Sequence, residues 1–190
     1  MVPWEDLEWR RVSEIEELNN PDNGPLEVFS KGIEPNDIKQ GKLGDCYLLA
    51  ALSVLAEKPQ RIKNLFILDK INEQGVFAVR FYKNGKMRNI VLDDYIPCNK
   101  QTGELVFAKG SGNELWVILL EKAFAKLHGS YERIADGKPF LTMRDLTGAP
   151  GYRMSTEKTE DLEHKMLSYQ NSGYLMCCIR SSKEAQAKDE

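Results

Sequence analysis

One segment limits the possible folds more than any other: an apolar helical repeat between Glu114 and Gly129. Apolar side chains recur there at intervals of three and four residues, at Leu115, Trp116, Leu119, Leu120, Ala123, Phe124 and Leu127. The preceding Ser111-Gly-Asn-Glu114 has the capping-box pattern, and Gly129 is a residue type that ends many helices. The pattern predicts a long buried helix around which the rest of a core must pack.

Length and composition set the scale of that core. The 190 residues are 42% hydrophobic, enough for one domain, or for one domain and a piece of a second. The formal net charge of −3 comes from interspersed charges, so we expect neither a nucleic acid nor an anionic membrane as partner. The longest apolar run, Leu115 to Leu120, cannot span a bilayer, and the first twenty residues lack a signal peptide's apolar centre. We therefore expect an intracellular, cytoplasmic protein without a transmembrane segment.

Shorter patterns describe the rest of the first 148 residues. Trp4 to Leu18 shows weak helical periodicity before a cluster of turn formers, so residues 1–28 are interpreted as a surface lead-in. Val76 to Tyr82 and Lys86 to Leu92 are β-like runs on either side of Asn84-Gly85. This dipeptide favours a type I′ turn because both residues tolerate positive φ, which predicts a β-hairpin.

A break in periodicity at Thr147-Gly-Ala-Pro-Gly151 suggests a domain boundary. We therefore divide the chain after the lead-in into residues 29–148 and 149–190. The second part is expected to contain a short amphipathic helix, with Leu162, Met166 and Tyr169 on one side, and a strand from Tyr174 to Ile179.

Cys46 is the first candidate for chemistry. Apolar residues between Asp45 and Glu57 fit one helical face, with Asp45 as N-cap, so Cys46 would lie in the first turn. A thiol attacks as its thiolate, which the N–H groups at a helix start stabilise. Gln40, reached through two glycines, could donate its amide to the oxygen that becomes negative when a thiolate attacks a carbonyl. The alternative is that Cys46 is a small buried hydrophobic residue, the usual fate of a free cysteine.

The other three cysteines are Cys98, Cys177 and Cys178. None of them has a comparable setting, and no C-x-x-C pair indicates a zinc or redox site. All four cysteines are interpreted as free thiols.

The segment Gln40-Gly-Lys-Leu-Gly-Asp-Cys46, followed by Leu48-Leu-Ala-Ala51, resembles the active-site helix of calpains. Three further blocks agree with the family in order and approximate spacing: Val91-Leu-Asp-Asp94 ending in Pro97, Gly112 to Glu132, and Asp145-Leu-Thr-Gly148. The resemblance implies an α+β, papain-like calpain protease core, with a helical first subdomain that contains the hairpin and a truncated, β-rich second subdomain. It also implies that Cys46 is the nucleophile and that Gln40 helps to form the oxyanion hole.

The chain departs from the family pattern in two respects. Calpains usually have tryptophan directly after the nucleophile, where this chain has Tyr47. The family's catalytic histidine and asparagine follow a strand that resembles Tyr174 to Ile179, and the sequence ends before them. His128, near a helix end where a cation is favourable, and His164, on an exposed helical face, are expected to be structural or solvated. We therefore expect this chain alone to be inactive.

The resemblance further implies a Ca²⁺ site made of the Ser30 and Gly32 carbonyls and the side chains of Asp37 and Glu114. Oxygen donors of this kind suit Ca²⁺. The alternative is that Asp37 caps a turn and Glu114 completes the capping box with Ser111.

The sequence leaves two functions from different classes open. The first is a calcium-dependent cysteine endopeptidase that cleaves internal peptide bonds of protein substrates, present here without the carboxy-terminal half of its protease core. The second is a non-catalytic calpain-like module that binds calcium or a partner protein. The acidic pair Asp93-Asp94 resembles another family element, with a solvated loop as the alternative.

Overall fold

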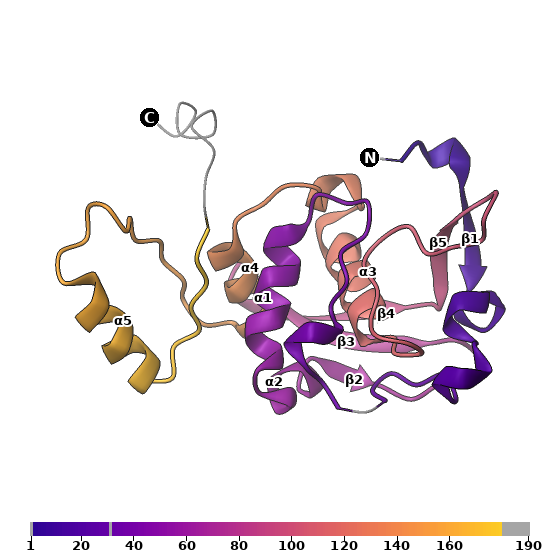
Figure 1. The fold of residues 1–190 in the computed structure, drawn as a ribbon, viewed down its shortest axis with the longest axis horizontal. Helices are drawn as coiled ribbons and strands as arrows, with labels where there is room; N and C mark the ends of the chain where they lie inside the picture. Colours follow the sequence, from indigo (N-terminus) through magenta and orange to yellow (C-terminus); the bar gives the residue numbers. More distant parts are fainter. Residues whose placement is uncertain (1, 31, 180–190) are drawn as a thin grey trace. The chain divides into compact units, whose positions relative to one another are not determined.

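The computed structural model describes residues 2–30 and 32–179 and divides them into two compact units, one ending at Tyr152 and one beginning at Arg153 (Figure 1). The α-helices are α1 (Cys46–Ala56), α2 (Pro59–Lys63), α3 (Trp116–His128), α4 (Pro139–Thr147) and α5 (Leu162–Asn171). The strands are β1 (Leu7–Arg11), β2 (Phe66–Leu68), β3 (Phe77–Lys83), β4 (Lys86–Leu92) and β5 (Tyr95–Asn99). Short 3-10 helices are η1 (Trp4–Asp6), η2 (Val12–Glu14), η3 (Glu16–Leu18), η4 (Pro21–Asn23), η5 (Pro35–Asp37) and η6 (Glu132–Ile134). This mixture of helices and strands fits the predicted α+β class.

Helix α3 is the centre of the first unit, as the apolar repeat predicts. Its residues from Trp116 to Ala125 are all buried, and it contacts β3, β4 and η6. Phe124 of α3 meets Phe81 of β3 edge to face, with ring centroids 6.1 Å apart. Each fully buried large apolar side chain of this kind contributes about 1.5–3 kcal/mol to folding.

The predicted capping box at the start of α3 is wrong. The helix begins at Trp116, with Leu115 at the N-cap position and no side-chain cap. The Glu114 carboxylate instead accepts hydrogen bonds from the Ser30 backbone N–H at 3.1 Å and from the Trp116 indole at 3.2 Å. A capping glutamate would have to reach back to its own turn. Glu114 reaches toward a segment that lies more than eighty residues earlier.

The predicted β-hairpin is confirmed. Strands β3 and β4 pair antiparallel from Phe77–Leu92 to Lys83–Lys86, and β2 adds to β3 to give the order β2-β3-β4. Asn84 and Gly85 have φ values of 52° and 72°, as a type I′ turn requires. Helix α4 also contacts β3.

The helical interpretation of Trp4 to Leu18 is wrong. Strand β1 occupies the middle of this segment and pairs antiparallel with β5, with 3-10 helices before and after it. The segment is also not a surface lead-in, since four of its apolar side chains are buried: Leu7, Val12, Ile15 and Leu18. A chain that alternates between strand and single 3-10 turns places apolar residues at uneven intervals, which imitate a weak helical period.

Helix α1 extends over nearly the residues expected and contacts α2, α4 and η5 (Figure 1). Helix α4 ends at Gly148, which adopts the left-handed conformation at φ 75°. A Cβ atom at that position would lie 2.8 Å from the Tyr82 ring. Two features therefore favour glycine at position 148: the positive φ and the close approach of the ring.

The second unit contains the expected helix, α5, but not the expected strand. Tyr174–Ile179 forms no strand and has no strand partner among the described residues, and a lone strand has no ladder to stabilise it. Residues 180–190, which the prediction placed in the same subdomain, lie outside the described residues. Within the described ranges, no helix is long and apolar enough to cross a membrane.

Candidate active site

Cys46 is the first residue of α1, and its side chain is exposed. The alternative of a buried, inert cysteine is therefore wrong for this residue. Leu48 and Leu49 donate their N–H groups to the Asp45 carbonyl at 2.8 and 3.2 Å, which closes the first turn of the helix. Asp45 stands at the N-cap position, but its side chain caps nothing and is fully buried. The Asp45 side chain therefore does not occupy the N–H groups of the first turn, where Cys46 lies.

Tyr47 anchors the start of α1 to the segment beyond α3. Its hydroxyl donates a hydrogen bond to the Ile134 carbonyl at 3.0 Å. Burial, and then the nearby charges of Asp45, Asp136 and Cys46, raise the pKa of Tyr47 to about 12. The phenol is therefore neutral at ordinary pH and serves as a donor.

The loop that carries Gln40 is fixed by its backbone. Lys39 and Lys109 exchange two backbone hydrogen bonds at 2.9 and 3.0 Å, and Lys42 donates to the Val106 carbonyl at 2.9 Å. A Cβ atom on Gly41 would lie 2.3 Å from the backbone of Phe107. The loop can lie this close only because residue 41 has no side chain.

Gln40 is exposed, and its Nε2 donates a hydrogen bond to the Leu43 carbonyl at 3.0 Å. The side-chain amide is thus folded over the loop that leads to Cys46. The amide group has a second N–H, which the Leu43 bond does not use. Gln40 and Cys46 lie at the two ends of one short loop. Backbone hydrogen bonds of Lys39 and Lys42 hold one end, and the Tyr47 hydroxyl holds the other.

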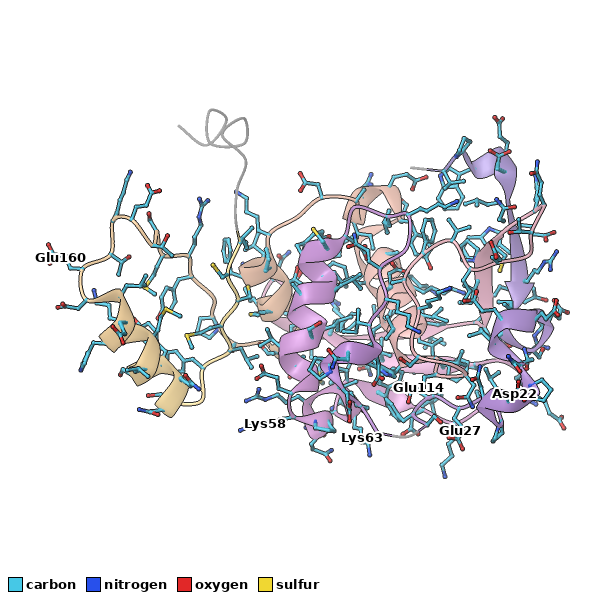
Figure 2. All side chains as sticks on the ribbon, in the orientation of Figure 1. Asp22, Glu27, Lys58, Lys63, Glu114 and Glu160 are labelled. Carbon is cyan, nitrogen blue, oxygen red and sulfur yellow. The ribbon has the colours of Figure 1, made fainter. Side chains whose placement is uncertain are left out.

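Three of the four residues predicted to bind calcium surround one cavity. Gly32, Asp37 and Glu114 line a volume of about 150 Å³ together with Glu34, which the sequence did not indicate. Ser30 lies next to it, with its N–H on the Glu114 carboxylate. Figure 2 labels Glu114 near Glu27, the residue with which it forms an isolated parallel bridge.

The donors around this cavity fit a hard cation only in part. Asp37 also accepts the Glu34 backbone N–H at 2.8 Å, so it does cap a turn, as the alternative proposed. The other half of that alternative is wrong, because Glu114 does not close a box with Ser111. Within residues 2–30 and 32–179, no three His, Cys, Asp or Glu side chains group as a metal site. The predicted ligands would offer an ion two carboxylates and backbone carbonyls, and the Glu34 carboxylate lines the same cavity.

His128 has a structural setting, as the sequence analysis expects, and its surroundings disfavour the cation that a helix end would favour. Burial and the charge of Lys83 lower its pKa, against the opposing effect of Asp145. The Lys83 Nζ lies 3.2 Å from both ring nitrogens and 3.2 Å from Asp145 Oδ2. His128 therefore belongs to a charged cluster that joins the ends of α3, β3 and α4. His164 belongs to the second unit, on the exposed surface of α5.

The solvated-loop alternative for Asp93-Asp94 holds for only one of the two residues, because Asp93 is exposed and Asp94 is buried. Asp94 is 4% exposed and accepts two hydrogen bonds from Arg11 Nε, at 3.0 and 3.2 Å. Burial opposes ionisation of Asp93, but hydrogen bonds from Lys122 and the Tyr95 N–H outweigh it and lower its pKa. The two carboxylates connect β1 and α3 to the turn between β4 and β5.

Comparison with known families gives a match over residues 2–190, to the calpain family cysteine protease domain. The calpain-type cysteine protease DEK1 of Arabidopsis thaliana is 38% identical over 178 residues, 89% of this chain and 8% of that protein. Calpain-A of Drosophila melanogaster is 38% identical over 150 residues, 77% of this chain and 17% of that protein. The calpain-2 catalytic subunit of Bos taurus is 36% identical over 146 residues, 75% of this chain and 20% of that protein.

The chain thus spans no more than about a fifth of these three relatives. The match nevertheless includes the exposed cysteine at the start of α1, the glutamine loop before it and the buried helix α3. The chain belongs to the calpain family of cysteine proteases.

Proposed function

We propose that this chain is the nucleophile-bearing part of a calcium-dependent calpain-type endopeptidase that hydrolyses internal peptide bonds of proteins. The observation that carries the proposal is the exposed Cys46 at the start of α1, behind a loop whose backbone is fixed. A structural cysteine needs neither exposure nor a helix start. The family match adds the reaction class.

In the proposed reaction, the Cys46 thiolate attacks the carbonyl carbon of the scissile bond. The carbonyl oxygen becomes negative and accepts hydrogen bonds from the Cys46 backbone N–H and from Gln40 Nε2. A histidine base would move the proton to the leaving amine. His128 is held by Lys83 and Asp145 instead, so we propose that the 190-residue chain by itself does not turn over substrate.

We further propose that the Ser30 and Gly32 carbonyls with the Asp37 and Glu114 carboxylates hold a Ca²⁺ ion. The support is the cavity that Gly32, Asp37 and Glu114 line. The bound ion would supply a fixed positive charge linking the loop before Cys46 to the start of α3. Asp37 lies in η5, which contacts α1, so ordering Asp37 is a route by which the metal could act on the Cys46 loop.

The arrangement proposed for the complete protease is papain-like. Residues 29–148 would form the first subdomain, and residues from 149 onward would begin the second. In this arrangement Cys46 would belong to the first subdomain and its histidine base to the second.

A peptidase assay tests the proposal. A fluorogenic peptide is offered, with and without Ca²⁺, to the 190-residue chain and to a longer protein that contains it. We expect Ca²⁺-dependent turnover by the longer protein, lost in Cys46→Ser, and no turnover by the chain alone. Cys46→Ser-sensitive turnover by the chain alone would disprove its inactivity. A longer protein with a histidine and an asparagine at the family positions but no Cys46-dependent turnover would refute the peptidase function.

A further inference from the structure

Two buried carboxyl groups meet beneath the start of α1. Asp45, the residue before Cys46, is 0% exposed, and Glu121 of α3 is 1% exposed. Both side-chain oxygens of Asp45 lack a hydrogen-bond donor among the described residues. Glu121 Oε1 accepts one hydrogen bond, from the Ala108 backbone N–H at 3.1 Å. Buried polar oxygens without donors are rare, and each needs a physical reason.

The two carboxyl groups are within hydrogen-bonding reach of each other. Two ionised carboxylates have only acceptors, so they can form no bond between them unless one is protonated. Burial, and then the charge of Asp45, raise the pKa of Glu121 well above its usual range. Burial also raises the pKa of Asp45, but the hydrogen bond from Glu121 opposes that effect. A single proton between the two groups would supply the donor that the Asp45 oxygens otherwise lack.

The surroundings keep this proton in place. Burial, and then the charge of Asp45, raises the pKa of Tyr47 of α1. Burial, and then the charges of Glu121 and Asp45, raises the pKa of Tyr131, just before η6. Asp93 and Asp136 add further negative charge to these phenols. Within the described residues, no cation contributes to the electrostatics of either carboxyl. Because two negative charges would lie together without compensation, the singly protonated pair is favoured over the doubly ionised one.

The pair connects the segments that carry the site. Through Ala108, Glu121 holds the strip of chain on which Lys39 and Lys42 form their backbone hydrogen bonds. Through Asp45, it holds the residue whose carbonyl closes the first turn of α1. Glu121 of the central helix thus contacts Ala108, in the strip of chain that supports the Gln40 loop, and Asp45, the residue before Cys46.

We propose that Asp45 and Glu121 share one proton, and that this neutralised pair is a positioning element that holds the Gln40 loop and the start of α1 in register. The positioning role rests on the proposed function of Gln40 and Cys46. The shared proton does not, and can be tested without any activity.

The first test compares two buried carboxyls of the first unit that should respond in opposite ways. Glu121→Gln keeps a donor for Asp45 and an acceptor for Ala108, whereas Asp94→Asn discharges the carboxylate that pairs with Arg11. At pH 7 we expect Glu121→Gln to shift the melting temperature Tm by less than about 3 °C, and Asp94→Asn to lower it by about 4 °C or more. Equal losses in the two variants would disprove the shared proton.

The pH dependence of the same variants makes the test sharper. Above about pH 4.3, the ordinary value for glutamate, the unfolded chain has released the proton that the folded chain keeps. The folded state then binds more protons, so wild-type stability contributed by the pair falls as pH rises toward the raised pKa of Glu121. Measured from pH 5 to pH 8, Tm of Glu121→Gln should therefore rise relative to the wild type. A constant difference across this range would also disprove the shared proton.

The second test concerns positioning and uses amide hydrogen exchange of the full 190-residue chain. We expect Glu121→Ala to accelerate exchange at Lys39, Lys42 and Leu48 by at least about tenfold, and Glu121→Gln to restore wild-type rates. Amides of the β3–β4 hairpin serve as the internal control and should change less. Uniform acceleration, or failure of Gln to rescue, would remove the positioning role. If Glu121→Ala does not fold, the Glu121→Gln comparison still decides the shared proton, and faster exchange at Lys39, Lys42 and Leu48 in Glu121→Gln would still remove the positioning role. An absence of peptidase function in the longer protein would leave these outcomes unaffected.

Discussion

The Tyr47 hydroxyl donates a 3.0 Å hydrogen bond to the Ile134 carbonyl, which ties the residue after the exposed Cys46 to η6. Gly137, three residues beyond Ile134, lies against the same ring, where a Cβ atom would be 2.4 Å from the phenol carbon. The start of α1 is therefore held by a polar contact and by a close packing contact. Each contact can be altered separately.

The first prediction concerns these two contacts. Tyr47→Phe should lower the free energy of unfolding by about 0.5–1.5 kcal/mol, because the Ile134 carbonyl loses its donor. Gly137→Ala should cost more, about 1–3 kcal/mol, because its methyl group would overlap the ring. Urea unfolding of both variants is the measurement, with Tyr95→Phe at an exposed side chain as the control. A loss in Tyr95→Phe as large as in Tyr47→Phe would show that the hydroxyl bond is not the cause.

A second prediction concerns thiol reactivity. Iodoacetamide should alkylate Cys46 before the other three cysteines, because its side chain is exposed at a helix start. Cys98 should react slowest. Burial raises its pKa to about 11 from 9.0, which lowers its thiolate fraction about a hundredfold in addition to blocking access.

Peptide mass mapping after brief labelling measures this order. Cys178 is the matched comparison, since its side chain is also exposed but does not start a helix. Burial raises the pKa of Cys177, so it should follow Cys178. Labelling of Cys178 ahead of Cys46 would contradict the assignment of Cys46 as the activated thiol.

A third prediction tests the proposed calcium site. With two carboxylates and neutral carbonyls, the chain should bind one Ca²⁺ with a Kd on the order of 10⁻⁵ to 10⁻³ M. At ten times Kd, the ion should stabilise the fold by about 1.4 kcal/mol. Asp37→Ala should abolish both effects.

Calorimetric titration and thermal unfolding in Ca²⁺ are the measurements for this site. Asp22→Ala is the control, because Asp22 is an exposed acidic residue that does not line the cavity (Figure 2). If the wild type gives no heat and no stabilisation at millimolar Ca²⁺, or if Asp37→Ala binds as well as the wild type, these ligands are wrong.

A fourth prediction concerns the cluster of His128, Lys83 and Asp145. The pKa of His128 is lowered in the fold by burial and by Lys83, so below about pH 6.5 the unfolded chain binds a proton that the folded chain resists. The contribution of neutral His128 to the free energy of unfolding is therefore fully present above about pH 6.5 and is lost as the pH falls. When the pH is lowered from 7.5 to 5.5, the Tm of His128→Gln should therefore fall by less than the Tm of the wild type. His164→Gln, at an exposed histidine, should follow the wild type, and a His128→Gln profile parallel to the wild type would contradict the lowered pKa.

Local chemistry explains which elements the sequence predicted. The turn at Asn84-Gly85 depends on two adjacent residues that tolerate positive φ. Helix α3 depends on apolar residues that recur at intervals of three and four within a segment of 13 residues. Both signals are contained within their own segments. The position of Cys46 at the start of α1 follows from the helix boundary that Asp45 marks in the sequence.

The features that the sequence missed depend on partners far along the chain. Strand β1 exists because β5 pairs with it, and Glu114 bonds with Ser30 rather than with Ser111. The same holds for Asp45, which has the residue type and the position of an N-cap but directs its carboxyl inward to Glu121. A capping motif and a buried carboxyl look identical in sequence, because only the approach of a distant helix distinguishes them.

The close approach of Gly41 to Phe107 has a consequence for the order of folding. The two residues are 66 positions apart, so their contact requires the intervening chain to close a long loop. Helix α1 and the β3–β4 hairpin are made of local contacts and can form earlier. In pulsed hydrogen exchange during refolding, the amides of α1 should be protected before those of Lys39 and Lys42. Cys46 would then be held in α1 before the loop that carries Gln40 is ordered. A newly made chain would pass through a stage in which the thiol is exposed but Gln40 is not yet positioned beside it.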